Sequence, residues 1–406
     1  MRVVLINRFF HPDESATALM LTDLVTGLAN PGLDLHVITA AAAYTPSGEH
    51  ARDTLGVDRL SVTRLPNLPL SHHSLAARAL NFLAFYCGLL VAGLFRVRRG
   101  DIVICLTDPP LVGIVAALLT RLKGATLIHW VQDIYPETAT RLGFGTSTNP
   151  AVRLAIRLRD WAWGTAHTNV VIGERMHAML VSRGVVPARL HIIQNWAEEE
   201  ALTPLAAEHN PLRAQWGFGK DVTVVGYSGN LGRAHDAATM LDAAALLGAR
   251  QDAPIRLLFI GGGAKHALLE TAADDPRLSN IVARRPYRPR AELQQSLSVP
   301  DIHWLSLEPE LEGLIVPSKF YGAAAVGRPI IFIGDTDGEV ARLIAKAQCG
   351  ASFAKGDAEG VANYLAVLAK DRALQAQLGE NARHYCTAHL SKEQRMDEWR
   401  SLVASV

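Results

Sequence analysis

The chain contains 406 residues, more than one hydrophobic core usually serves, so its length predicts two lobes. Apolar residues make up 49% and charged residues 19% of the chain, a balance that excludes an intrinsically disordered protein. The 40 basic residues nearly equal the 39 acidic ones, which disfavours a general nucleic-acid-binding protein.

The cysteines and the first residues bear on the cellular compartment. The four cysteines are scattered, without the Cys-x-x-Cys or Cys/His spacing of a metal site. Met1 to Asn7 is too short an apolar run for a secretory signal. We therefore expect a cytoplasmic protein with no bound metal or other cofactor.

β-branched segments alternate with longer Ala- and Leu-rich segments along the first half of the chain. This alternation is typical of α/β sheets with parallel strands, which are buried on both faces. It predicts a Rossmann-like, doubly wound lobe over residues 1–200. The expected strands are Val3 to Asn7, Leu35 to Thr39, Ile102 to Leu106, Thr126 to Trp130, Asn169 to Ile172 and Leu190 to Ile193.

A polar stretch over residues 195–221 reads as a linker or a short connecting helix, and a second Rossmann-like lobe is expected over residues 201–385. The last domain, 386–406, should end in an amphipathic helix, because Met396, Trp399 and Leu402 follow one another at spacings of three. The strands expected in the second lobe are Val222 to Tyr227, Ile255 to Ile260, Ile302 to Leu305 and Pro329 to Ile333, with helices over Leu241 to Leu247 and Val361 to Ala369.

Ligands of open parallel sheets bind where strands end, so the turns after strands are the places to look for function. The turn after the first strand has no glycine, which disfavours a dinucleotide-binding enzyme. Its Asp13, Glu14 and Ser15 could bind a hydroxylated acceptor. A Ser15 that caps the following helix explains the same residues equally well.

Polar side chains crowd together after the fourth expected strand. Gln132 and Asp133 can hydrogen-bond to vicinal sugar hydroxyls, and Tyr135 offers its ring to a pyranose. We predict Gln132 and Asp133 as catalytic residues and Tyr135 as an acceptor contact. The alternative is that Pro136 and Glu137 merely start a helix.

Two turns of the second lobe suit a diphosphate. In the first, Gly229 and Asn230 allow close approach of backbone amides, and Arg233 adds a charged fork. In the second, Pro317 fits a first helical turn, Ser318 offers a hydroxyl and Lys319 adds a cation beside the helix start. The Gly261 to Gly263 turn is explained as well by tight packing.

Acidic residues surround the second of these turns. Glu312 precedes it, and we predict that it contacts the sugar and takes part in catalysis. For Glu308 and Glu310, a solvated acidic loop is the favoured explanation. Asp335 and Asp337 match an acid-x-acid metal motif, but a turn with a helix cap is favoured.

Two segments suggest contact with a membrane. Ala79 to Phe95 is almost wholly apolar, but it is shorter than the ~20 residues that span a bilayer, and arginines flank it. Arg153 to Trp163 mixes arginine with tryptophan, as headgroup-level segments do. Peripheral contact with the inner face of the cytoplasmic membrane is expected, and a buried helix is the alternative for the first segment.

Taken in order, these motifs resemble the bacterial glycosyltransferases of family 4, particularly those that add deoxy or amino sugars in O-antigen, capsule and colanic-acid assembly. The resemblance implies the GT-B fold, whose two lobes face a central cleft, with a terminal helix that returns to the first lobe. It also implies metal-independent transfer with retention, from a UDP-linked donor to a lipid-linked or polysaccharide-precursor acceptor. The motifs are Trp130 to Glu137, Asn195-Trp196, Tyr227 to Gly232, Pro317 to Lys319 and Gly327 to Pro329.

The chain departs from the family pattern at two places. Many relatives carry two glutamates separated by seven residues, where this chain has Leu314 and Gly322, so Glu312 substitutes only approximately. Asn230 and His235 replace the usual Arg and Lys of the earlier turn. Two alternatives therefore stay open: a nucleotide-sugar 2-epimerase of the same fold, and a non-catalytic, membrane-attached scaffold that binds nucleotide sugar.

Overall fold

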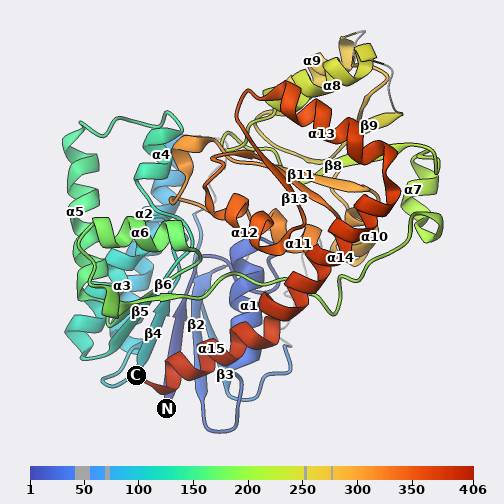
Figure 1. Ribbon diagram of the computed structural model, residues 1–406. Helices are drawn as coiled ribbons and strands as arrows, with labels where there is room; N and C mark the ends of the chain where they lie inside the picture. Colours follow the sequence, from blue (N-terminus) through green and yellow to red (C-terminus); the bar gives the residue numbers. More distant parts are fainter. Residues whose placement is uncertain (42–54, 69–73, 251–253, 276–277) are drawn as a thin grey trace. The chain divides into compact units, whose positions relative to one another are not determined.

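The computed structural model describes residues 1–41, 55–68, 74–250, 254–275 and 278–406. The described chain forms two compact units: unit 1 comprises Met1–Gln194 and Arg395–Val406, and unit 2 comprises Asn195–Gln394. Each unit is built on one sheet of parallel strands, and Figure 1 shows helices beside both sheets. The predicted pair of parallel α/β lobes is confirmed.

The sheet of unit 1 has seven strands in the order β3-β2-β1-β4-β5-β6-β7. All neighbouring strands run parallel, so the carboxyl ends of all seven lie along one edge. The strands are β1 (Arg2–Ile6), β2 (Asp34–Ala40), β3 (Leu60–Leu65), β4 (Ile102–Cys105), β5 (Thr126–Val131), β6 (Thr168–Val171) and β7 (Leu190–Ile192).

Helices cover both faces of this sheet because alternate strand residues are apolar on either side. Val4 and Ile6 belong to a core shared with α2, α3 and α5, whereas Trp130 packs on Trp399 of α15 with ring centroids 4.8 Å apart. The helices of unit 1 are α1 (Ala16–Leu28), α2 (Leu75–Arg96), α3 (Val112–Lys123), α4 (Glu137–Arg141), α5 (Pro150–Thr165), α6 (Glu174–Ser182) and α15 (Lys392–Ala404), with a 3₁₀ turn at Pro187–Arg189.

Unit 2 contains a six-stranded parallel sheet in the order β10-β9-β8-β11-β12-β13. Its core includes Tyr227, Phe259 and Trp304, whose rings are packed against one another. The strands are β8 (Thr223–Asn230), β9 (Ile255–Gly262), β10 (Val282–Arg285), β11 (Ile302–Ser306), β12 (Ile330–Gly334) and β13 (Gly350–Ala354). The helices are α7 (Pro211–Gln215), α8 (Ala238–Arg250), α9 (His266–Asp274), α10 (Leu293–Leu297), α11 (Lys319–Ala325), α12 (Glu339–Ala347), α13 (Ala358–Lys370) and α14 (Arg372–His389), with 3₁₀ turns at Ala207–His209, Arg290–Glu292 and Pro309–Leu311.

Three strands were not predicted: β3, β10 and β13. Each lies at an edge of its sheet and is less buried than the strands at the centre. An edge strand has one paired side only, and its residues need not form the apolar run that marks a central strand. The sequence pattern therefore identified the centre of each sheet and missed these edges.

The unit boundaries differ from the expected ones at 200 and 385, because the chain divides after Gln194 and after Gln394. Residues beyond 385 still belong to unit 2, where the Lys392 amide donates to the Glu199 carboxylate at 3.1 Å. The amphipathic helix α15 then continues into unit 1, where Met396, Trp399 and Leu402 are buried.

The helix expected over Ala79 to Phe95 is longer than predicted, since α2 extends over Leu75–Arg96. It is the one helix of the described chain that is long and apolar enough to cross a membrane by length and composition. Phe85 and Leu89 on one side belong to the unit 1 core, so α2 is part of this fold. The buried-helix alternative is right for that side only, because the other side is exposed.

Candidate functional site

The Gly229 turn of unit 2 begins in the last two residues of β8, Gly229 and Asn230, and continues into the loop that follows. Gly229 has a φ of +124°, which L side chains rarely adopt, and a Cβ there would lie 2.9 Å from Cε of Lys319. The Tyr227 hydroxyl donates to the Asn230 carbonyl at 2.9 Å and fixes the turn. Glycine at 229 thus allows the first side chain of α11 to lie against the carboxyl end of β8.

Lys319 and His235 form the polar centre of this turn. The Nδ1–H of His235 donates to the Ser306 carbonyl at 2.6 Å, which leaves Nε2 to accept from Lys319 Nζ at 3.3 Å. Burial lowers the pKa of Lys319 to about 8. Burial, followed by the charge of Lys319, lowers the pKa of His235 to about 4, so its ring is neutral near pH 7.

Lys319 makes no ion pair with any carboxylate in the described part of the chain. Its Nζ lies 5.1 Å from the centre of the Tyr227 ring, a weak cation–π contact. A mostly buried ammonium without a carboxylate is costly unless an anion joins it. Lys319 would therefore gain an ion pair if an anion bound beside Gly229.

Glu308 was expected in a solvated acidic loop, and that expectation is wrong. Its carboxylate accepts from Lys265 and from Lys355, each at 2.7 Å. Although burial raises the pKa of Glu308, these two hydrogen bonds hold it below its usual value. Glu310 is exposed, as expected. The lysines at 265 and 355 are thus already neutralised, unlike Lys319.

Glu312 lies at the amino end of α12. Its Oε1 accepts from the Glu339 amide at 2.8 Å, and a Cβ at Gly338 would lie 2.4 Å from its Oε2. The carboxylate predicted to touch the sugar therefore has a structural contact as a helix cap. Just before this helix, the Asp337 amide donates to Asp335 at 2.9 Å in a turn, and the described residues contain no cluster of three or more potential metal ligands.

The remaining donor residues predicted from the sequence differ in their exposure and in their place in the fold. Asn230, the last residue of β8, and Arg233 in the loop after it are both exposed. Pro317 is buried but precedes α11 rather than forming its first turn, because Ser318 is the N-cap residue and the helix begins at Lys319. Ser318 is exposed and its side chain makes no capping hydrogen bond.

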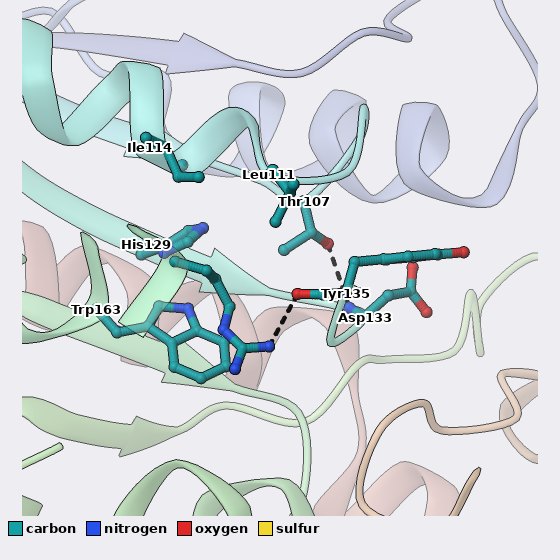
Figure 2. A pocket seen from close by; sticks show the side chains of 9 residues that line it. Thr107, Leu111, Ile114, His129, Asp133, Tyr135 and Trp163 are labelled. Carbon is teal, nitrogen blue, oxygen red and sulfur yellow. Dashed lines mark hydrogen bonds between the residues drawn. The ribbon is translucent and has the colours of Figure 1, made fainter. Parts of the chain in front are cut away.

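In unit 1, the loops after β4 and β5 are joined by a single hydroxyl group. Thr107 Oγ1 accepts from the amides of Gln132, at 3.3 Å, and Asp133, at 3.2 Å. Figure 2 shows Asp133 and Tyr135 side by side, extending away from His129 and Trp163. Two residues predicted from the sequence thus project together from the edge of the sheet.

Asp133 has a second carboxylate beside it that the sequence analysis missed. Burial, followed by the charge of Asp108, raises the pKa of Asp133 to about 6. Burial also raises the pKa of Asp108 to about 6, although Arg8 opposes the shift. Asp108 lies three residues after the end of β4, so the rule that ligands bind where parallel strands end would have found it.

Arg159 holds the backbone behind these side chains. Its guanidinium donates to the Tyr135 carbonyl at 2.8 Å and to both oxygens of Glu137, and it stacks 4.0 Å above the Trp163 ring. The cavity beside it has a volume of about 10 Å³, room for a water molecule but not for a sugar. The helix-start alternative is right for Glu137, the first residue of α4.

The acceptor residues predicted in the first turn divide between two roles. Ser15 is the N-cap of α1, and its hydroxyl accepts from the Ala18 amide at 3.3 Å. Glu14 is exposed. Asp13 is buried, which raises its pKa against the charges of Arg64 and Arg8. Because Arg8 also faces Asp108, Asp13 belongs to the same charged cluster.

Two sequence families match successive parts of the chain. The family described as "Glycosyl transferase 4-like domain" matches residues 16–196, and "Glycosyl transferases group 1" matches residues 208–385. The protein named "Probable glycosyltransferase WbjE" of Pseudomonas aeruginosa is 31% identical over 257 residues. That match covers 61% of this chain and 61% of the relative's length.

Solved structures share the fold at low sequence identity. The crystal structure of HepE from Anabaena in complex with UDP has a TM-score of 0.75 and 15% identity over all of both chains. WaaG, described as a glycosyltransferase involved in lipopolysaccharide biosynthesis, has a TM-score of 0.70 and 14% identity over 98% of this chain and 99% of its own. With the two matched domains and the two parallel-sheet lobes, these findings place the chain in the family 4 glycosyltransferases of the GT-B fold.

Proposed function

We propose that this protein transfers a sugar, with retention at the anomeric carbon, from a UDP-linked donor to a lipid-linked or polysaccharide-precursor acceptor. The observation that carries the proposal is Lys319, a mostly buried ammonium beside the Gly229 turn with no carboxylate partner among the described residues. Such a group gains an ion pair and hydrogen bonds when a diphosphate binds.

The names of similar proteins support the donor and the pathway class. HepE has been crystallised with UDP and with UDP-glucose, and WaaG acts in lipopolysaccharide biosynthesis. A UDP-sugar is therefore the donor that we infer for this chain, in the assembly of a cell-surface polysaccharide. The preference for an amino or deoxy sugar comes from the family resemblance of its motifs.

The proposed transfer needs no metal ion, because the chain itself supplies positive charge. Lys319 and the amides of the Gly229 turn would stabilise the charge that develops on the leaving diphosphate. The acceptor oxygen would bond to the anomeric carbon on the face that the diphosphate leaves, and its proton would pass to a phosphate oxygen. In this scheme Glu312 supports the loop next to the donor from its place at the α12 cap.

Unit 1 would provide the acceptor side. Asp133 and Gln132 at the edge of the sheet would bind and orient the reacting hydroxyl, and Tyr135 would contact the sugar ring. Asp13 and Glu14 would contribute further acceptor contacts from the first turn. Asp133 at a pKa of about 6 is ionised near pH 7 and can accept a hydrogen bond from a hydroxyl.

We further propose that unit 1 attaches peripherally to the inner face of the cytoplasmic membrane. The exposed side of α2 carries a helical stripe of apolar residues, and Phe95 is 81% exposed. Leucines are also exposed on α3 and α5, and α3 packs against both α2 and α5. This apolar face comprises Leu80, Leu83, Val91, Leu94 and Phe95 of α2, Leu118 and Leu122 of α3, and Leu154, Leu158 and Trp161 of α5.

The charges around this apolar face suit an anionic interface. Arg78, Arg96, Arg153 and Arg157 are exposed on the same helices. Interfacial helices combine such a basic rim with a buried apolar stripe, and an attached enzyme can reach an acceptor whose lipid stays in the bilayer. Because the opposite side of α2 is packed in the core of unit 1, lying on the membrane is favoured over crossing it.

Transfer assays with purified protein, UDP-sugars and a lipid diphosphate acceptor test the proposal. A glycosylated lipid with a retained anomer is expected, and release of an epimerised sugar would instead support the 2-epimerase alternative. Binding of UDP-sugar without turnover would support the scaffold. Lys319→Ala should weaken donor binding about 10- to 100-fold, the loss of one charged hydrogen bond, and unchanged affinity would remove Lys319 from the donor site.

A further inference from the structure

Unit 1 contains a second hollow at the opposite edge of its sheet from Asp133. It lies where β5 and β6 begin and where α3 and α5 end, and its volume is about 590 Å³. Cavities of this size commonly accommodate small ligands. Because parallel-sheet proteins bind their main ligands at the carboxyl ends of strands, the proposed donor and acceptor sites do not use it.

The described residues that line this hollow include basic and imidazole side chains but no aspartate or glutamate. The basic groups are Arg121, His167, Arg189 and His191. Arg121 and both histidines have no side-chain hydrogen bond or ion pair with other described residues. The hollow therefore offers hydrogen-bond donors and positive charge that are not paired with other described residues.

Only one of the two arginines of the hollow caps a helix end. Arg189 donates to the Gly164 carbonyl at 2.6 Å near the end of α5, which is a capping role. At the end of α3, however, the Ala125 amide donates to the Thr120 carbonyl at 2.9 Å, and Arg121 is not used. The hydroxyls of Thr165 and Ser405 already donate to helix carbonyls. Among the basic side chains, the unused donors are thus Arg121 and the two imidazoles.

The acids nearest to the hollow are already neutralised. An adjoining groove along α15, of about 470 Å³, shares His191 and Ser405 with the hollow and contains Asp397 and Glu398. Asp397 is paired with Arg400 at 2.6 Å, and Glu398 with Arg395 at 3.0 Å. These pairs leave the basic groups of the hollow available to an external anion.

We propose that this hollow binds a phosphate group, supplied by the headgroup of an anionic membrane lipid or by a soluble phosphate ester. The lipid source is favoured by continuity with the apolar face of α3 and α5. Leu122 follows Arg121 on α3, and Trp161 lies one turn before Thr165 on α5, so acyl chains over these residues would place a headgroup at the hollow. This preference for a lipid rests on the membrane attachment proposed above.

Vesicle binding by the full-length protein tests the lipid source. Vesicles of phosphatidylcholine with phosphatidylglycerol should bind the wild-type protein, and Arg121→Gln combined with His167→Gln should lower that affinity about five- to tenfold. Arg141→Gln with His177→Gln is the matched control, because it removes the same residue types from unit 1 outside both the hollow and the basic rim of the apolar face. Equal losses in both variants would show general surface attraction and overturn the proposal.

A soluble phosphate distinguishes the two sources. Glycerol phosphate should shift the NMR signals of the Arg121 guanidinium and the His167 ring in the wild-type protein, whether or not the protein binds membranes. If it also displaces the protein from anionic vesicles, the lipid headgroup occupies the hollow, and if it shifts the signals without displacement, the soluble ester is the ligand. No shift together with wild-type vesicle binding by the double variant would refute the site, even if transfer activity and membrane attachment were established.

Discussion

Gly229 and Lys319 lie in direct contact, because a Cβ at position 229 would come within 2.9 Å of Cε of Lys319. Gly229→Ala should therefore displace the lysine and strain a backbone with φ of +124°, at a cost of roughly 1–3 kcal/mol of stability. Donor affinity, measured by calorimetry, should fall with it. Gly232→Ala is the control, since the nearest atom to its Cβ would lie 3.5 Å away in the Asn230 side chain. Equal effects of the two substitutions would contradict the contact.

The charge of Lys319 should make donor binding depend on pH. Its pKa of about 8 means that the ammonium is charged below pH 8 and is lost as the pH rises through that value. Affinity for UDP should therefore decline between about pH 7.5 and 9 in titrations on the wild-type protein. Lys319→Arg stays charged across this range and should abolish the decline. A decline that persists in the arginine variant would assign it to another group.

Asp133 should lower the stability of the protein when its side chain is ionised. Its pKa is raised from 3.8 to about 6, so the protein is most stable below about pH 4, where the carboxyl is protonated, and this stability is lost as the pH rises through about 6. Asp133→Asn should make the protein roughly 1–2 kcal/mol more stable at pH 8 than the wild type, with little gain at pH 4, in urea denaturation. Glu14→Gln, at an exposed carboxylate, should change little at either pH.

Asp133→Asn should also lower turnover more than donor binding, because Asp133 is placed on the acceptor side. Asp108→Asn should lower the pKa of Asp133, since it removes the neighbouring negative charge. The acid limb of the rate profile near pH 6 should then move to lower pH. Equal losses of kcat and donor affinity in Asp133→Asn would argue against the assignment.

The contact between Trp130 and Trp399 should make α15 essential to the stability of unit 1. Both indoles are fully buried, and Trp399→Ala would remove one of the two rings. We expect a loss of about 3–5 kcal/mol in the free energy of unfolding. Ser401→Ala, at an exposed position of the same helix, should leave it unchanged. A small effect at Trp399 would mean that α15 is not packed on the sheet in solution.

The exposed stripe of α2 should determine membrane attachment without supporting the fold. Leu94→Gln together with Phe95→Gln should reduce binding to anionic vesicles about tenfold or more, from the apolar area withdrawn from the bilayer. Thermal stability should stay as in the wild type. Leu268→Gln, an exposed leucine of unit 2, is the control. Vesicle binding that survives the α2 substitutions would exclude this face.

The sequence by itself determined the architecture at the centre of each unit and the motifs at the ends of its strands. Central strands such as β1 and β12 are buried on both faces, and this requirement leaves an apolar run in the sequence. The rule that ligands bind where parallel strands end led to Asp133 and to Lys319. Edge strands such as β10 carry no such run, because one of their sides lies outside the sheet.

Only the tertiary structure decided what each polar or apolar side chain contacts. Glu312 caps α12, and Glu308 pairs with two lysines, through contacts between segments far apart in the chain. Likewise, α2 is apolar on both sides, and packing alone decided that Phe85 is buried and Phe95 exposed. Composition and spacing record how apolar a segment is, whereas pairing, burial and pKa depend on neighbours that folding brings together.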